Sequence, residues 1–202
     1  MKTNYDKIMQ DSISRLSKRE RLLLHACCAP CSSAVLERLS PHFDITLFFY
    51  NPNMDGEEEY NKRASELIRL VKETGNAANV IIPPFEPLEY QCIVKGLEKE
   101  REGGIRCHAC YRLRLKKTAE YAKEHGFEKF TTTLSISPHK NADIINSIGL
   151  ELEKEIGIPF LVADFKKRGG FKRSIELSKQ YGLYRQNYCG CVYSKRARVE
   201  ND

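Results

Sequence analysis

The sequence lacks any apolar run near the roughly 18 residues that a membrane-spanning helix needs. Met1–Arg21 is polar and charged, without the apolar core of a secretory signal peptide, so we expect a cytoplasmic protein. Internal repeats and low-complexity tracts are also missing. With 202 residues, of which 41% are hydrophobic and 30% charged, the chain has the size and composition of one globular domain with a proper core.

Short strand patterns and longer helix patterns alternate along the chain. Five segments rich in apolar, β-branched or aromatic residues predict strands, at Leu22–Cys27, Asp44–Tyr50, Asn79–Ile82, Lys129–Leu134 and Phe160–Phe165. Helices are predicted at Pro30–Leu39, residues 56–74, Leu88–Lys99, Ala109–His125, Ala142–Ile156 and Phe171–Gly182. This order predicts a single α/β domain with a Rossmann-like (HUP-like) parallel sheet of about five strands and helices on both faces. Residues 1–20 are a polar N-terminal segment, and residues 183–202 are expected to be irregular.

Eight cysteines stand out in such a chain. Reducing cytosol disfavours structural disulfides, so clustered cysteines favour metal binding or redox catalysis. His25–Cys31 places Cys27, Cys28 and Cys31 at a predicted strand end and helix start, where thiolates are stabilised. Cys107–Cys110 is a Cys-x-x-Cys pair at a second loop-to-helix junction. Together these segments offer thiols for a four-thiolate site, holding either zinc or a [4Fe–4S] cluster.

Several motifs that would point to other proteins are absent. Ala34 stands where a radical-type Cys-x3-Cys-x2-Cys triplet would have its third cysteine, and the adjacent Cys27 and Cys28 argue against a zinc ribbon. The Ser-Gly-Gly-x-Asp-Ser loop of an ATP-dependent tRNA thiolase is replaced by Cys-Cys-Ala-Pro-Cys, and no other phosphate cradle is evident. Such a thiolase, a zinc-stabilised nucleic-acid-binding module and a plain thiol oxidoreductase remain the alternatives.

Cys189 and Cys191, separated only by Gly190, form a separate signal. On an extended chain their Cα atoms would lie roughly 6.5–7 Å apart, at the upper limit for a disulfide. Gly190 lets the backbone bend, and a strained disulfide is easily reduced, which favours a redox-active pair. The alternatives are a second pair of metal ligands or two unpaired thiols. Cys92, within a helix pattern, is expected in the core.

Other candidate residues follow the predicted strands or lie in the tail. Asp164 can bind a metal or donate a proton, although an N-cap or an ion pair would use it equally well. His25 and His108 flank cysteines, and each is either a proton donor or a support for its neighbours. Aromatic and basic residues near the last cysteines suit base stacking or phosphate binding. The expected substrate contacts are Tyr50, Asn51, Asn53, His139, Lys166, Arg185 and Tyr188.

The chain is basic, with a formal net charge of +6. Positive charge gathers at Arg112–Lys117, Lys166–Arg173 and Lys195–Arg198. These stretches fit either phosphate neutralisation on a nucleic acid or solvated helix faces, and the sequence leaves both open.

At these motifs the sequence resembles the QueH-type epoxyqueuosine reductases. The matching segments span nearly the whole chain in family order, at His25–Cys31, Phe49–Asn53, Cys107–Cys110, Asp164–Lys167 and Arg185–Cys191. The resemblance implies that the epoxide of epoxyqueuosine, at the wobble position of tRNAs for Tyr, His, Asp and Asn, is reduced to the cyclopentene of queuosine. It also implies a [4Fe–4S] cluster, a redox-active disulfide and a low-potential electron donor that the sequence does not identify.

Carried onto this chain, the resemblance implies Cys27, Cys28, Cys107 and Cys110 as cluster ligands and Cys189–Cys191 as the disulfide. Cys31 is left over, as a ligand for an additional mononuclear iron or as a redox partner, and the choice among the first three cysteines stays open. Cys189 and Cys191 would store the electron pair. Asp164 or His108 would protonate the departing oxygen.

Overall fold

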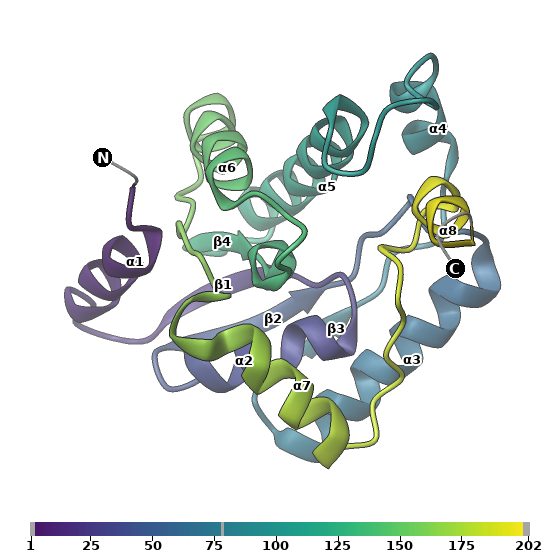
Figure 1. Cartoon of the computed structure of the whole chain (residues 1–202). Helices are drawn as coiled ribbons and strands as arrows, with labels where there is room; N and C mark the ends of the chain where they lie inside the picture. The colour runs from purple at the N-terminus through teal and green to yellow at the C-terminus, as the bar shows by residue number, and fades with distance from the viewer. Residues whose placement is uncertain (1–2, 78, 200–202) are drawn as a thin grey trace.

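A parallel sheet of four strands forms the centre of the molecule, seen in a computed structural model that describes residues 3–77 and 79–199 (Figure 1). The strands are β1 (Glu20–His25), β2 (Phe43–Phe48), β3 (Asn79–Ile81) and β4 (Lys129–Thr132). Their order is β3-β2-β1-β4, and every pairing is parallel. The predicted α/β class and Rossmann-like parallel sheet are therefore confirmed.

Helices cover both faces of this sheet, as the sequence predicted (Figure 1). The α-helices are α1 (Tyr5–Ser14), α2 (Ala29–Leu39), α3 (Glu57–Thr74), α4 (Leu88–Val94), α5 (Ile105–Glu124), α6 (Ala142–Ile156), α7 (Gly170–Gln180) and α8 (Val192–Val199). Side chains of a strand alternate between the two faces. Leu22 and Leu24 accordingly pack into one core layer with residues of α2, α3 and α7, whereas Leu23 packs into a second layer with α5 and α6.

The predicted fifth strand, Phe160–Phe165, lies beside β4 but pairs with it only briefly. The two segments share one parallel bridge, between Phe130 and Phe160. Beyond it, side chains replace the backbone ladder, because Asn146 Oδ1 accepts from Ala163 N at 2.9 Å and Ser135 Oγ from Phe165 N at 3.3 Å. The segment runs in the place of a strand without forming one, so the described part of the chain holds a four-stranded sheet.

Three local predictions are wrong in part. The tail is not irregular throughout, because Val192–Val199 forms α8, begun by a hydrogen bond from Ser194 N to Cys191 Sγ at 3.4 Å. The helix predicted to reach Lys99 ends at Val94, since Lys95 is extended. Cys92 is exposed rather than in the core. The part of the predicted tail at residues 200–202 lies outside the described residues.

No helix in the described ranges is long and apolar enough to cross a membrane.

Replacing Gly149 with alanine is expected to destabilise the fold. Gly149 faces the Phe160 ring so closely that a Cβ atom would lie 2.3 Å from Phe160 Cε1. Overpacking a core costs about 1–3 kcal/mol, which outweighs the roughly 0.5–1 kcal/mol that alanine gains over glycine inside a helix. Urea unfolding will measure the change. Ser147→Ala, on the exposed side of the same helix, is the control and is expected within about 0.5 kcal/mol of the parent. Equal stability of the two variants would contradict this packing.

Candidate metal and redox site

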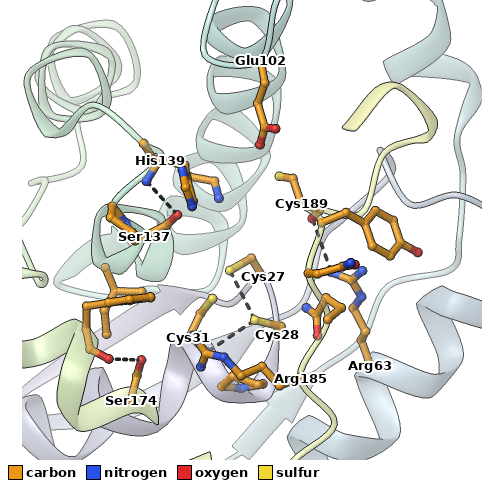
Figure 2. A pocket seen from close by; sticks show the side chains of 18 residues that line it. Cys27, Cys28, Cys31, Arg63, Glu102, Ser137, His139, Ser174, Arg185 and Cys189 are labelled. Carbon is orange, nitrogen blue, oxygen red and sulfur yellow. Dashed lines mark hydrogen bonds between the residues drawn. The ribbon is translucent and has the colours of Figure 1, made fainter. Parts of the chain in front are cut away.

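The candidate site lies where the chain order in the sheet reverses. From β1 the chain continues to β2 on one side, while β4 joins on the other side, and ligands of open α/β sheets bind at the carboxyl ends of such strands. A cavity of about 260 Å³ opens there (Figure 2). Four thiols line it, from Cys27, Cys28, Cys31 and Cys189. The site thus brings together the first cysteine motif and the last one, which lie at opposite ends of the sequence.

The three-cysteine loop joins β1 to α2 and presents its sulfur atoms as a compact group. The Sγ atoms of Cys27, Cys28 and Cys31 lie within 4.8 Å of one another, close enough for one metal ion. Cys28 is the N-cap of α2, where its Sγ accepts from Cys31 N at 3.3 Å, and Pro30 occupies the first turn. Thr133, which follows β4, donates its hydroxyl to this loop or accepts from it, with Oγ1 3.4 Å from Cys27 Sγ.

These thiols have unequal acidities. Hydrogen bonds from Cys28 and Cys31 lower the pKa of Cys27 well below its usual value. The hydrogen bonds with Cys27 raise the pKa of Cys28 and of Cys31, and burial raises both values further. Cys27 is therefore the first of the three to ionise. A metal that binds thiolates would displace the protons of the other two.

The second group of thiols lies next to the first. Cys107 and Cys110, in the first turns of α5, line a smaller cavity together with Cys189 and Cys191. Gly103 N donates to Cys107 Sγ at 3.2 Å. Burial raises the pKa of Cys107, and it raises that of Cys110 to about 12. Cys189 lines both cavities, so the structure gathers all three predicted cysteine segments around one region.

Two buried cations and one half-buried cation accompany the thiols. Arg63 and Arg114 are only 2% and 1% exposed, and Lys140 lines the larger cavity. Burial lowers the pKa of Arg114 while the thiolates of Cys110 and Cys27 raise it, with a net increase. Lys140 behaves alike, because burial lowers its pKa and the Cys189 and Cys27 thiolates raise it further. A set of thiolates with compensating positive charge fits an anionic thiolate-bound metal centre such as a [4Fe–4S] cluster.

Sequence reasoning missed these three cations as site residues. Lys140 had a signal, since it follows His139 in the loop after β4. Arg114 lies within a basic stretch that fits a solvated helix face, and for this residue that interpretation is wrong. Its Nε donates to His25 Nε2 at 3.2 Å, and its Nη2 donates to Asn51 Oδ1. Only the tertiary structure shows that Arg63 turns inward from α3.

Three of the predicted substrate contacts line the larger cavity, namely His139, Arg185 and Tyr188. Tyr50 and Asn51 line neither of the two cavities. The Tyr50 hydroxyl donates to Glu89 at 3.2 Å, and Asn51 is fully buried with its Nδ2 donating to Ala26 O at 2.9 Å. Asn53 lines the smaller cavity with the second thiol group, and its buried Oδ1 has no partner within the described part of the chain.

The predicted proton donors do not line the two cavities that the thiols share. Asp164 pairs with Lys166 at 2.7 Å, and both line a neighbouring cavity that also reaches Lys140. His108 is half-buried next to Cys107, and its Nε2 has no partner among the described residues. His25 is fully buried, and burial followed by the Arg114 charge lowers its pKa to about 3. His25 is therefore a neutral support beneath the cysteine loop.

All eight cysteines are free thiols in the structure. The Cys189–Cys191 disulfide therefore stays a prediction. Gly190, between them, has φ +121, a conformation that side chains rarely adopt, and its carbonyl accepts from Asp55 N at 2.8 Å. The backbone bend that the sequence required of Gly190 is present.

Comparison with known proteins gives a consistent result. The sequence model described as "Epoxyqueuosine reductase QueH" matches residues 22–197. Proteins of that name are similar to this chain over most of its length. The one from Streptococcus pyogenes is 44% identical, covering 96% of this chain and 79% of its own length. For Staphylococcus epidermidis the values are 41%, 96% and 85%, and for Thermotoga maritima they are 37%, 89% and 92%.

Proposed function

The chain belongs to the family of QueH epoxyqueuosine reductases and is an oxidoreductase of queuosine biosynthesis, and from this premise we propose that it reduces epoxyqueuosine to queuosine at the wobble position of tRNA. The observation that carries the proposal is the meeting of three cysteine segments, His25–Cys31, Cys107–Cys110 and Cys189–Cys191, around two contiguous cavities. A tRNA substrate is consistent with the cytoplasmic location predicted from the sequence.

The proposed metal centre is a [4Fe–4S] cluster held by Cys27, Cys28, Cys107 and Cys110. When bound, the cluster would supply electrons of low potential, and the additional iron would act as a Lewis acid on the epoxide oxygen. Arg114 and Lys140 would compensate the negative charge of the thiolates. Cys31 is the remaining thiol of the loop and the proposed ligand of an additional iron.

The Cys189–Cys191 dithiol matches the stoichiometry of the reaction. Converting an epoxide to an alkene consumes two electrons and two protons and releases water. Oxidation of two thiols to one disulfide releases two electrons and two protons, so the pair balances the step. A low-potential donor would then reduce the disulfide and return both thiols. Cys189 lines both cavities and is therefore the proposed link between the substrate and the second thiol group.

Substrate binding is proposed for residues on the larger cavity and beside it. Arg185 and Tyr188 carry positive charge and an aromatic ring at its mouth, which suit a phosphate and a base respectively. His139 is exposed on the opposite side and is placed to hydrogen-bond the modified base. Lys166, in the neighbouring cavity, would contact the RNA backbone. The tRNAs that we propose as substrates are those for Tyr, His, Asp and Asn.

The test is an anaerobic assay on tRNA that carries epoxyqueuosine, with excess low-potential reductant and mass analysis of the released nucleosides. Queuosine formation by the parent protein, with about four sulfides and at least about four irons per chain, is the expected result. Stoichiometric zinc without sulfide would instead favour the nucleic-acid-binding module.

The double variant Cys189→Ser/Cys191→Ser is expected to retain iron and sulfide while losing turnover by at least about a hundredfold, because no thiol pair remains to balance the two-electron step. Cys92→Ser is the matched control, since Cys92 is exposed and lines neither cavity. Unchanged turnover in the double variant would exclude the dithiol from the mechanism.

A further inference from the structure

Residues 184–190, here called the strap, carry Cys189 along one side of the larger cavity on the way from α7 to α8 (Figures 1 and 2). The strap runs along α3 and is fastened to it from its first residue. Tyr184 N donates to Glu66 Oε2 at 2.8 Å, and the Tyr184 hydroxyl donates to Glu59. The position of Cys189 at the two cavities therefore depends on how α3 holds this segment.

Arg63 of α3 makes most of the polar contacts to the part of the strap next to Cys189. Its Nη1 donates to the Cys189 carbonyl at 3.3 Å and, with the amide of Gln186 oriented to satisfy both of its partners, to Gln186 Oε1 at 2.8 Å. The guanidinium also lies over the Tyr188 ring, 5.1 Å from its centre. Glu59, one helical turn earlier, accepts from Arg63 Nε at 2.6 Å and fixes its orientation.

The packing at the end of the strap is close as well. A Cβ atom on Gly190 would lie 2.8 Å from Met54 Sδ and 3.2 Å from Arg63 Nη1. The strap therefore fits against the Arg63 guanidinium at Gly190 with no room for a side chain. A guanidinium presents its donors in a fixed planar fork, so few other side chains could fasten three strap residues at once.

Arg63 also faces the three-cysteine loop. Arg63, Cys28 and Cys189 line the same cavity, and Figure 2 shows Arg63 on the side of Cys189. Burial lowers the pKa of Arg63, whereas the Cys28 thiolate and the Glu59 carboxylate raise it, with a net increase. One buried cation thus touches the strap on one side and lies near the loop thiols on the other.

We propose that Arg63 is a positioning residue, which holds Cys189 at the place where it lines both cavities and sets the redox equilibrium of the Cys189–Cys191 pair. The role of the pair in turnover rests on the proposed function, whereas the placement of the thiol does not. Without Arg63 the strap loses its charged hydrogen bonds, so Cys189 becomes more accessible. The backbone from Cys189 to Gly190 also loses the hold of the Arg63 guanidinium, so residues 189–191 can bend more freely, which favours closure of the disulfide.

The test compares Arg63→Gln with the parent as anaerobically purified, reduced protein. Alkylation of Cys189 by iodoacetamide, followed by mass spectrometry of the peptide 186–195, is expected to be about tenfold faster in the variant, as the loss of charged hydrogen bonds would give. Equilibration with reduced and oxidised dithiothreitol is expected to favour the disulfide about tenfold more, which is a decrease of about 30 mV in the potential of this two-electron couple. Both quantities are compared at equal iron and sulfide content, because Arg63 also lies near the Cys28 thiolate.

Arg69→Gln is the matched control on the same helix. Arg69 also fastens this region, donating to the carbonyls of Tyr181 at 2.9 Å and Gly182 at 3.2 Å, but both of these residues come before the strap. It is expected to leave both the alkylation rate and the potential at the parent values. An equal effect of the two variants would reduce Arg63 to a general stabiliser of the fold and overturn the proposal.

A second variant removes the strap side chains that Arg63 contacts and leaves Arg63 paired with Glu59. Gln186→Ala/Tyr188→Ala is expected to reproduce the faster alkylation, and Arg63→Lys to fall between the parent and Arg63→Gln. If Arg63→Gln does not fold, the strap variant decides alone. Parent-like alkylation and potential in the folded variants would overturn the proposal even if the reductase assay succeeds. The predicted changes together with a failed reductase assay would overturn only the proposed function.

Discussion

Replacing Cys27 with serine is expected to strip the anaerobically purified protein of its iron and inorganic sulfide and to abolish turnover. Cys27 lies at the centre of the site, with its Sγ 3.9 Å from Cys28 Sγ and 3.4 Å from Thr133 Oγ1. Its lowered pKa makes it the thiolate that is ready to bind metal. A serine hydroxyl stays protonated and binds iron poorly. Replacing even a residue that only supports a metal ligand lowers metal affinity or activity by about 10–100-fold. Replacing a ligand itself should therefore lower turnover by more than about a hundredfold.

The serine variants of Cys28 and Cys31 resolve the choice that the sequence left open. Cys28→Ser is expected to behave as Cys27→Ser does, since Cys28 is a proposed ligand and also the N-cap of α2. Cys31→Ser is expected to keep about four irons and four sulfides per chain, because Cys31 is not among the proposed cluster ligands. Cys92→Ser again serves as the exposed control. A Cys27→Ser protein with a full complement of iron would remove Cys27 from the ligand set.

The order of the fold was predictable because its signals are local. Strand β1, the three-cysteine loop and α2 follow from an apolar run, a strand end and Pro30 in a first helical turn. Convergence of the strand ends followed from the parallel sheet alone. The prediction of a fifth strand was wrong because the side chains of Asn146 and Ser135, which are distant in sequence, accept the hydrogen bonds of its backbone N–H groups. The prediction missed helix α8 because the helix starts with Cys191 Sγ as the acceptor at its N-terminus, and cysteine is not among the usual N-cap residues.

The cysteines of the site were predictable, but their surroundings were not. The spacing of the cysteines can be taken directly from the sequence, whereas a helix pattern does not distinguish a buried arginine from a solvated one. Asn51 and Tyr50 show the limit of the argument from strand ends. Both follow β2 at the correct edge of the sheet, yet Asn51 points inward to Arg114 and to Ala26, and Tyr50 points away to Glu89. Proximity to a strand end predicts the neighbourhood of a site but not the direction of a side chain.

Replacing Arg114 with methionine is expected to lower the free energy of unfolding by about 3–5 kcal/mol, as the removal of one partner from a buried charged network does. Arg114 joins β1 to the loop after β2, through His25 Nε2 and Asn51 Oδ1, and both acceptors would be left buried without it. In a chain of this size the loss corresponds to a decrease of about 6–20 °C in melting temperature. Urea and thermal unfolding of the iron-depleted, reduced protein will measure it without the contribution of metal.

Arg112→Met supplies the comparison within the same helix. Arg112 is 43% exposed and pairs with Glu151 and Glu155 on the surface, so its loss is expected to cost at most about 1 kcal/mol. Arg114→Lys should fall between the two, since a lysine keeps the charge but lacks the fork that reaches both acceptors. Because Arg114 also compensates the thiolates of Cys110 and Cys27, its methionine variant is expected to bind less iron even under conditions in which it is folded. Equal stabilities of the Arg112 and Arg114 variants would show that the thiol site does not rest on this buried cation.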